Sequence, residues 1–587
     1  MCVYIYRSQR LCLTAAVCGL YVLSHYVGVM FSKPVAKDAN VPATREFAVT
    51  AGRFFLDNKL SSADAADLFE KASALDTTGA LNEFKKLRRT LPTGKRNKNL
   101  CRDLTRRLLK RCPWPEPSMA KVPCWSNKQQ KIITLDVPIL LPHRIIAALA
   151  TRNALTTLLK EDVMDSDTKQ HLEKVRLKLQ DDKVLAIGIW IDGVPYNNNR
   201  MESLEVFSMN LCGLDNMRVP LAAIPKKYMA ADNITHDAVL EIISWSLEQC
   251  ILGVHPYAGP AGVDLSPKEK QLSGHSFPKA AVCEVRGDWA CFKSVFRLPG
   301  WQEKAGCCWR CTCTPAEVSQ VSSQASWRQP ESRLTHWDVL QRIIDKGHTL
   351  CPLFNAPFVD TTVFRIDWLH CADLGITLEF LASFFLMILP KMGKRKEDLN
   401  CSELYLLMKE FYTRTGCTSR LDTLKPSMLK KQNGKSATLR AKAGESRALV
   451  PFVLELCQKL TFCTPEEQTA VHAATALAEC YQCLSADVFN IQKIEIAARK
   501  FATQYCALNA FAKQQGLRRW QVKPKLHLFL ELTQCSSSPA LTWTYRDEDF
   551  GGHVAKVCKR LAGLNSPRTV GLQLLSRFRA KSSLSVA

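Results

Sequence analysis

Three acidic residues of the sequence are candidates for metal binding and catalysis. Asp192 ends the apolar run IGIWID, Asp288 ends the segment VRGD, and Glu548 lies in the acidic triplet of TYRDEDFGG. Phosphoryl transfer with two metal ions uses several carboxylates around ions about 3.5–4 Å apart. One ion activates the attacking water or 3′-hydroxyl, and the other stabilises the leaving oxygen. The alternative is structural, because Asp-Gly and Gly-Asp are common turn dipeptides and acids are favoured in the first turn of a helix.

The strand pattern favours a metal pair for the first two acids. VLAIGIWID (184–192) is a continuous apolar run, typical of a central strand buried on both faces. The elements expected after it are strands at 204–214, 219–225 and 280–292 and a helix at 236–253. Three strands, a helix and a fourth strand is the order of an RNase H-like fold, in which strands one and four are neighbours. Asp192 and Asp288 would then meet at one edge of the sheet, where two carboxylates repel each other and favour shared divalent cations.

The third acid must come from a distant part of the chain. TYRDEDFGGHVAKVCKR (544–560) predicts an amphipathic helix that opens with an acidic triplet and has a basic end. Glu548 is the preferred third ligand, with Asp547 and Asp549 as alternatives. Helix capping is the structural reading of all three.

These segments together resemble a known family. Asp192 in IDGV, Asp288 in RGDWA, WLHCADLG (368–375), KPKLHLFLEL (523–532) and DEDFGG resemble the DDE transposases of cut-and-paste DNA transposons. The similarity covers about residues 184–560 and is greatest to the hAT, CACTA and Plavaka/Kyakuja types, which carry a long helical insertion before the last acid.

The resemblance implies an α/β fold, with an RNase H-like mixed sheet, a long all-helical insertion and a helical, basic region before them. It also implies that Asp192, Asp288 and Glu548 form the metal-binding and catalytic triad, with Mg²⁺ or Mn²⁺ as the cofactor. The activity would be strand nicking by water and strand joining by the freed 3′-hydroxyl. The partners would be DNA, as transposon ends and target, and further copies of the chain, because two ends must be held together.

The segment GCCWRCTC (306–313) is a second group of metal-ligand residue types. Many relatives have C-x-x-H after the second acid, whereas here Cys308 and Cys311 form C-x-x-C, which suggests a zinc knuckle that needs two more ligands. His370 is the first candidate, and the others are Cys371, Cys307 and Cys313. Thiolate and imidazole ligands suit tetrahedral Zn²⁺. Buried, unpaired thiols are the alternative, and for His527 a core position is favoured over a contact with DNA or the active site.

The charge balance indicates a polyanionic partner. Lys and Arg number 79 against 55 Asp and Glu, which leaves a net charge of +24. Twelve Lys and Arg but one acid lie between Lys85 and Arg111, and TRRLLKR (105–111) predicts a helix with one basic face. The candidate DNA-contacting residues are Arg88, Arg89, Arg106, Arg107 and Lys110. A solvated helix face or a nuclear-import signal is the alternative, and a nuclear location is expected.

The N-terminal segment LCLTAAVCGLYVLSHYVGVMF (11–31) is about the minimum length for a membrane helix. It is either a membrane anchor, a signal-peptide core or an extension from an upstream start codon. The expected organisation is a hydrophobic segment at 1–35, a helical basic region at 36–183, an RNase H-like core in two parts at 184–375 and 521–587, and a helical insertion at 376–520.

Three functions therefore remain open from the sequence. The first is a transposase-like nuclease and strand transferase. The second is a transposon-derived protein that binds nucleic acid without catalysis, which the missing N-terminal zinc finger of such transposases also permits. The third is a membrane protein anchored through residues 11–31, whose apolar run is its only support.

Overall fold

The computed structural model describes residues 43–57, 59–76, 81, 84, 100–109, 112, 114–151, 161–197, 202–214, 217–260, 263–429, 436–534, 536–559 and 566–586. The chain divides into two compact units. One comprises residues up to 112 with 214–218 and 579–587, and the other comprises 113–213 with 219–578. Both the predicted hydrophobic segment 11–31 and the candidate residues Arg88, Arg89 and Lys110 lie outside the described residues.

The first unit is helical. Its helices are α2 (Ala43–Leu56), α3 (Ser62–Leu75), α4 (Leu100–Leu109) and the end of α20 (Pro567–Val586). Phe55, Phe69 and Leu104 form its core with Ala580 of α20. On α4, Leu104 is buried while Arg106 is exposed and Arg107 is partly buried, as expected for a helix with one basic face.

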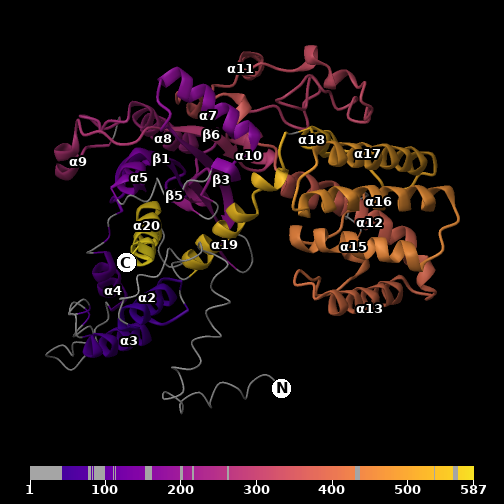
Figure 1. The fold of residues 1–587 in the computed structure, drawn as a ribbon, viewed down its shortest axis with the longest axis horizontal. Coiled ribbons are helices and arrows are strands. Elements are labelled where there is room, and N and C mark those ends of the chain that lie inside the picture. Colours follow the sequence, from indigo (N-terminus) through magenta and orange to yellow (C-terminus); the bar gives the residue numbers. More distant parts are fainter. Residues whose placement is uncertain are drawn as a thin grey trace. The chain divides into compact units, whose positions relative to one another are not determined.

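The second unit contains a four-stranded mixed sheet (Figure 1). Its strands are β3 (Leu185–Pro195), β4 (Ser203–Leu211), β5 (Arg218–Pro225) and β6 (Ala280–Arg286). The order is β5-β4-β3-β6, in which β4 is antiparallel to β3 and β6 is parallel to β3. A parallel bridge between Val285 and Phe364 adds one more chain segment beside β6. The expected mixed α/β fold and the central position of β3 are therefore confirmed.

The fourth predicted strand is shorter than expected. The sequence predicted a strand over 280–292, but β6 ends at Arg286 and α10 (Trp289–Ser294) follows at once. Asp288 is the cause, because its side chain accepts a hydrogen bond from the backbone N of Cys291 and caps this helix.

The region 36–183 is not wholly helical, so that part of the prediction was wrong. β1 (Ser118–Ser126) and β2 (Lys131–Ile139) form an antiparallel hairpin. Every second residue of β1 from Ser118 is buried, which is the period of a strand with one face in the core. The helices α5 (Pro142–Ala150) and α7 (Ser166–Leu179) follow it, as the sequence predicted.

Helices pack against the sheet. The face that carries Ala186 and Trp190 of β3 packs against α7 and against α19 (Tyr545–Lys559). α8 (Ile234–Leu252) contacts β1 and β6, and its Ile251 shares a core cluster with α7 and Ala186. Gly253 ends α8 with a φ of 68°, the left-handed conformation that glycine adopts without steric cost.

The segment between the sheet and α19 is mainly helical, as expected. Its longer helices are α12 (Thr377–Ile388), α13 (Glu397–Thr415), α15 (Ala443–Lys459), α16 (Pro465–Ser485) and α17 (Ile491–Gln514). The predicted capping box at the start of α16 is confirmed, since Thr464 and Glu467 cap each other's backbone N–H groups. The shorter helices of the unit are α9 (Pro267–Leu272), α11 (His336–Asp345), α14 (Pro426–Leu429) and α18 (Lys525–Leu532).

Within the described residues, one helical segment is long and apolar enough to cross a membrane. It runs from Leu369 to Met392 and comprises a π-helical turn (Leu369–Ile376), α12 and a short 3₁₀ turn. Its most apolar part is 83% buried within the protein, as in the core helix of a globular domain.

Candidate active site and a cysteine–histidine cluster

The register of the sheet brings Asp192 and Asp288 together. Trp190 of β3 pairs with Arg286 of the parallel strand β6. Two residues further along, Asp192 is still on β3 and Asp288 begins α10, so the two carboxyl groups stand at the same edge. Burial, followed by the charge of Asp288, raises the pKa of Asp192 to about 6. The sequence had predicted this meeting of the two acids.

Glu548 reaches the same edge because α19 lies close against β3. The closest point is Gly551, where a Cβ atom would be 3.1 Å from Val194 Cγ2 and 3.3 Å from the Trp190 ring. Glu548 precedes Gly551 by about one helical turn and therefore lies on the same side of α19. Burial and the charge of Asp192 raise the pKa of Glu548 to about 7. The structure thus gathers the three predicted acids around one edge of the sheet.

Asp547 and Asp549, which flank Glu548 in sequence, do not lie beside Asp192. Asp547 is fully buried, and its Oδ2 lies 3.4 Å from Nη1 of Arg286. Arg286 also pairs with Glu284, with Nη2 2.8 Å from Oε1. Asp549 is exposed on the outer side of α19. Of the three candidates in the triplet, Glu548 alone faces Asp192, and Asp547 has a structural role instead.

His370 lies among the acids and not with the cysteines. Its Nδ1 is 2.6 Å from Asp367 Oδ2, and its Nε2 is 3.7 Å from Glu548 Oε1. Burial opposes protonation of His370, but the hydrogen bond and charge of Asp367 raise its pKa to about 9. The prediction that His370 joins Cys308 and Cys311 in a zinc site was therefore wrong. Asp367 instead holds the imidazole beside Asp192, Asp288 and Glu548, which together are called the acidic edge.

Asp367 is a further residue of this site, which the sequence pattern did not predict. This buried carboxylate accepts hydrogen bonds from the backbone N and the hydroxyl of Thr544, at 2.9 and 2.8 Å, and also contacts His370. Thr544 directly precedes α19, and its carbonyl accepts from the backbone N of Glu548 at 2.8 Å. Asp367 thus fixes the start of the helix that carries Glu548. The D-x-x-H spacing within RIDWLH was the only local signal for it.

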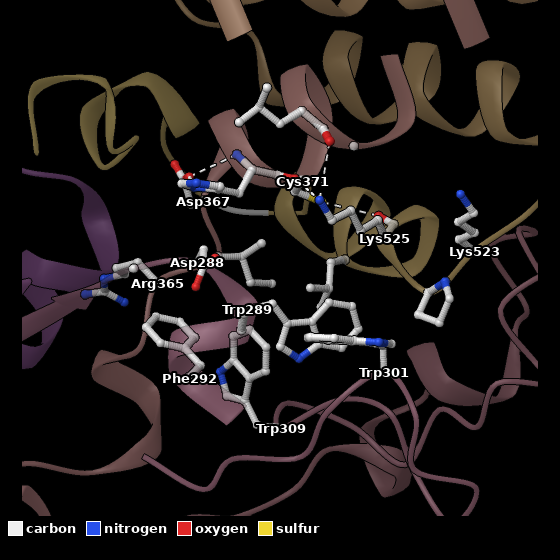
Figure 2. A pocket seen from close by; sticks show the side chains of 18 of the residues that line it. Asp288, Trp289, Phe292, Trp301, Trp309, Arg365, Asp367, Cys371, Lys523 and Lys525 are labelled. Carbon is white, nitrogen blue, oxygen red and sulfur yellow. Dashed lines mark hydrogen bonds and ion pairs between the residues drawn. The ribbon is translucent and has the colours of Figure 1, made fainter. Parts of the chain in front are cut away.

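A cavity of about 390 Å³ opens beside Asp288. Figure 2 shows Asp288 and Asp367 toward one end and Trp301 and Lys523 toward the other. Its aromatic lining comprises Trp289, Phe292, Trp301 and Trp309, and its cations include Arg365, Lys523 and Lys525. An aromatic wall with cations next to clustered acids is suited to a ligand that has both a flat ring and a negative charge.

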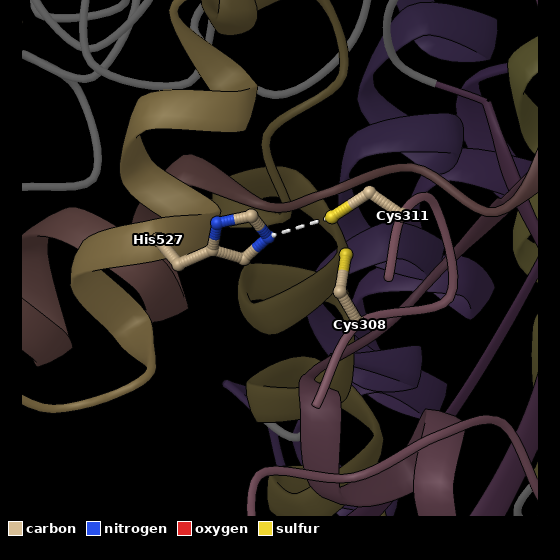
Figure 3. Close-up of side chains that lie close together, drawn as sticks. All are labelled: Cys308, Cys311 and His527. Atoms are coloured by element: carbon tan, nitrogen blue, oxygen red, sulfur yellow. Dashed lines mark hydrogen bonds between the residues drawn. The ribbon is translucent and has the colours of Figure 1, made fainter. Parts of the chain in front are cut away.

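The cysteine segment meets α18 in a separate cluster (Figure 3). Cys308 Sγ, Cys311 Sγ and one ring nitrogen of His527 all lie within 4.8 Å of one another, and the three residues are buried. Burial opposes ionisation of the Cys308 thiol, yet the hydrogen bond from Cys311 and the charge of His527 hold its pKa well below the usual value. His527, which was expected to be a core histidine, is therefore the histidine that joins the C-x-x-C pair.

The acidic edge has the donor set of a divalent-cation site. Carboxylate oxygens are the preferred ligands of Mg²⁺ and Mn²⁺. Asp192 and Glu548 carry raised pKa values because each is partly buried beside another acid. A shared cation would remove this repulsion, and the donor chemistry suits such an ion. Asp192, Asp288 and Glu548 would hold it. Among the described residues, however, only Cys308, Cys311 and His527 have ligand atoms that all lie within 4.8 Å of one another.

The raised pKa values predict a pH-dependent stabilisation by divalent ions. Without a cation, the folded chain keeps protons on Asp192 and Glu548 that the unfolded chain loses. The contribution of these two groups to the free energy of unfolding is therefore complete below about pH 4 and is lost as the pH rises to about 7. The contribution of His370 is likewise lost as the pH rises through about 9.

Mn²⁺ should therefore raise the melting temperature of the second unit more at pH 8 than at pH 5, where protons compete with the ion. Tryptophan fluorescence during heating measures this, because all tryptophans lie between residues 114 and 543. Asp192→Asn should reduce the shift at pH 8. An equal shift at both pH values would contradict the predicted site.

Comparison with known proteins does not assign this chain to a family. No family model matches the sequence, and no curated protein compared with it gives a significant match. The function proposed below therefore rests on the sequence pattern and on the geometry of the described residues.

Proposed function

We propose that this chain is a transposase-like enzyme that nicks DNA and transfers strands at Asp192, Asp288 and Glu548, with an RNase H-like sheet as its core. The observation that carries the proposal is the convergence of three acids from distant segments, β3, the start of α10 and α19, at one sheet edge. The strand order β5-β4-β3-β6 and the parallel bridge of Phe364 to β6 support the RNase H-like topology.

The three carboxylates provide a negatively charged edge that binds divalent ions. When bound, Mg²⁺ or Mn²⁺ supplies a more acidic attacking oxygen and charge stabilisation for the leaving oxygen. Asp288 is fixed by its cap on α10, and Glu548 is fixed through Thr544 and Asp367. This rigid support holds the carboxylates in place without help from the substrate.

His370 supplies the only imidazole that contacts Glu548 among the described residues. As a cation at neutral pH, it offsets part of the negative charge at the edge. Its hydrogen bond to Asp367 fixes the ring so that Nε2 faces Glu548. We expect it to position Glu548 rather than to react itself.

The substrate class follows from charge and from the cavity. A net charge of +24 favours binding to a polyanion. Of the tryptophans beside Asp288, the exposed Trp301 offers a ring for an unpaired base, and base–aromatic stacking contributes about 1–3 kcal/mol per base. A single DNA strand entering at the acidic edge would therefore find a stacking surface on Trp301.

The test is metal-dependent cleavage by the full chain. Purified protein should nick labelled duplex DNA with Mg²⁺ or Mn²⁺, and should join a 3′-hydroxyl end to a target duplex. The product of joining is larger than either substrate, so it separates from simple nuclease contamination on a denaturing gel. DNA binding with no cleavage under either ion would instead support the second function, a transposon-derived binding protein without catalysis.

A further inference from the structure

Cys308, Cys311 and His527 converge although the whole predicted insertion, 376–520, lies between the cysteines and the histidine in sequence. The cysteines lie in the loop after α10, and His527 lies on α18. Cys311 Sγ is 3.3 Å from Nε2 of His527, and the three ligand atoms lie within 4.8 Å of one another. Each of these residues has no solvent-exposed surface.

An ordinary core histidine does not account for this arrangement. Among the described residues, Nδ1 of His527 has no hydrogen-bond partner, and Nε2 contacts only a thiol, which is a weak donor and acceptor. A buried imidazole without good hydrogen bonds is destabilising. The convergence of two thiols and one imidazole nitrogen therefore calls for a further partner at their centre.

We propose that Cys308, Cys311 and His527 bind one structural Zn²⁺. Two thiolates and an imidazole are ligands that tetrahedral zinc prefers, and C-x-x-C is a common spacing for two of them. Binding releases the two thiol protons to solvent, since the ligands are thiolates. The proposal is independent of the nuclease function, because none of the three residues belongs to the acidic edge.

The fourth ligand is either a thiol of the same loop or a water molecule. Glu531 lies one turn after His527, but Arg333 holds both its oxygens, at 2.7 and 2.9 Å. Cys307 and Cys313 are the remaining thiols, and a backbone hydrogen bond of 2.8 Å from Cys307 N to Cys313 O brings their ends of the loop together. One of these two thiols or a water molecule completes the tetrahedron.

The zinc ion would link the loop that follows α10 to α18, which begins shortly after the helical insertion. α18 carries Lys525, whose Nζ donates to the carbonyl of His370 at 2.7 Å. The cluster therefore holds in register the two segments that flank the cavity, the loop after α10 and α18. Loss of zinc should loosen this junction without unfolding the strands of the sheet.

The first test is the metal content of the full chain, produced without a histidine tag and analysed by plasma mass spectrometry after gel filtration. We expect one zinc ion per chain, and its replacement by Co²⁺ should give the visible absorption of a tetrahedral site with sulfur ligands. Cys308→Ser and Cys311→Ser should each lose the metal. Cys250→Ser, a buried thiol on α8 outside the cluster, is the matched control and should retain it.

A rescue variant separates ligation from folding. His527→Ala should lose zinc, whereas His527→Cys should regain it with a Co²⁺ spectrum that shows one more sulfur ligand. Cys307→Ser and Cys313→Ser identify the fourth ligand, because only the variant that lacks it changes this spectrum, and no change in either indicates water. A wild-type chain that carries no zinc and has a Cys308–Cys311 disulfide by peptide mass spectrometry would overturn the proposal.

Discussion

Asp288→Asn is expected to abolish DNA nicking and strand joining, with a fall in rate of at least about a thousand-fold. Metal-assisted charge stabilisation contributes several kcal/mol to such reactions, and about 1.4 kcal/mol corresponds to a tenfold change in rate. Asparagine keeps an oxygen that can accept from Cys291 N, so α10 should still form. The change therefore removes the charge and leaves the local fold intact.

The acidic triplet of α19 provides controls for this prediction. Glu548→Gln should cause a similar loss, whereas Asp549→Asn, one residue away and exposed, should change the rate by less than about twofold, as expected for a group outside the site. Rates are measured on labelled duplex DNA with Mn²⁺, and melting curves of each variant show that it is folded. Nicking that survives both Asp288→Asn and Glu548→Gln would remove the triad from the mechanism.

Arg286→Met is expected to lower the free energy of unfolding of the second unit by about 3–5 kcal/mol, the usual cost of removing one partner of a buried ion pair. Arg286 is buried between Glu284 and Asp547, which are themselves almost fully buried. Removing the guanidinium leaves both carboxylates without this cation. Because Asp547 adjoins Glu548, the variant should also lose nicking activity.

Arg568→Met is the matched control for Arg286→Met. Arg568 pairs with Asp136 at 3.2 Å, but 60% of its side chain is exposed, so its loss should cost less than about 1 kcal/mol. Urea unfolding followed by tryptophan fluorescence reports on the second unit alone, since it contains every tryptophan. Equal destabilisation by the two changes would show that the buried ion pairs do not support α19.

The sheet could be predicted because a run of neighbouring residues in the sequence marks each of its strands. The apolar run 184–192 became β3, and Gly253 ended α8 where the sequence had placed the end of a helix. Asp192 and Asp288 lie close together because the parallel pairing of β3 and β6 fixes the register of the two strands. The sequence favours Glu548 over its neighbours, and in the structure Glu548 lies near the charge of Asp192 while Asp547 contacts Arg286.

The partners of the histidines could not be predicted, because they depend on contacts between distant segments. His370 stands next to Cys371 in sequence, yet Asp367 turns it toward the acids. His527 is separated from Cys311 by 216 residues, and no local spacing relates them. The hairpin β1–β2 is not evident from the sequence, because apolar Met119 and Trp125 stand between the buried residues of β1 and the burial of β2 does not alternate.

The position of Glu548 after the helical insertion has a consequence for synthesis of the protein. The strands that carry Asp192 and precede Asp288 emerge from the ribosome first, whereas α19 follows only after α12–α18. At about 5–20 residues per second, at least about ten seconds pass between the second and the third acid. Nascent chains and products truncated within the insertion would thus hold two acids and lack the third. If the proposed triad is the catalytic site, the chain cannot cut DNA until α19 has been translated.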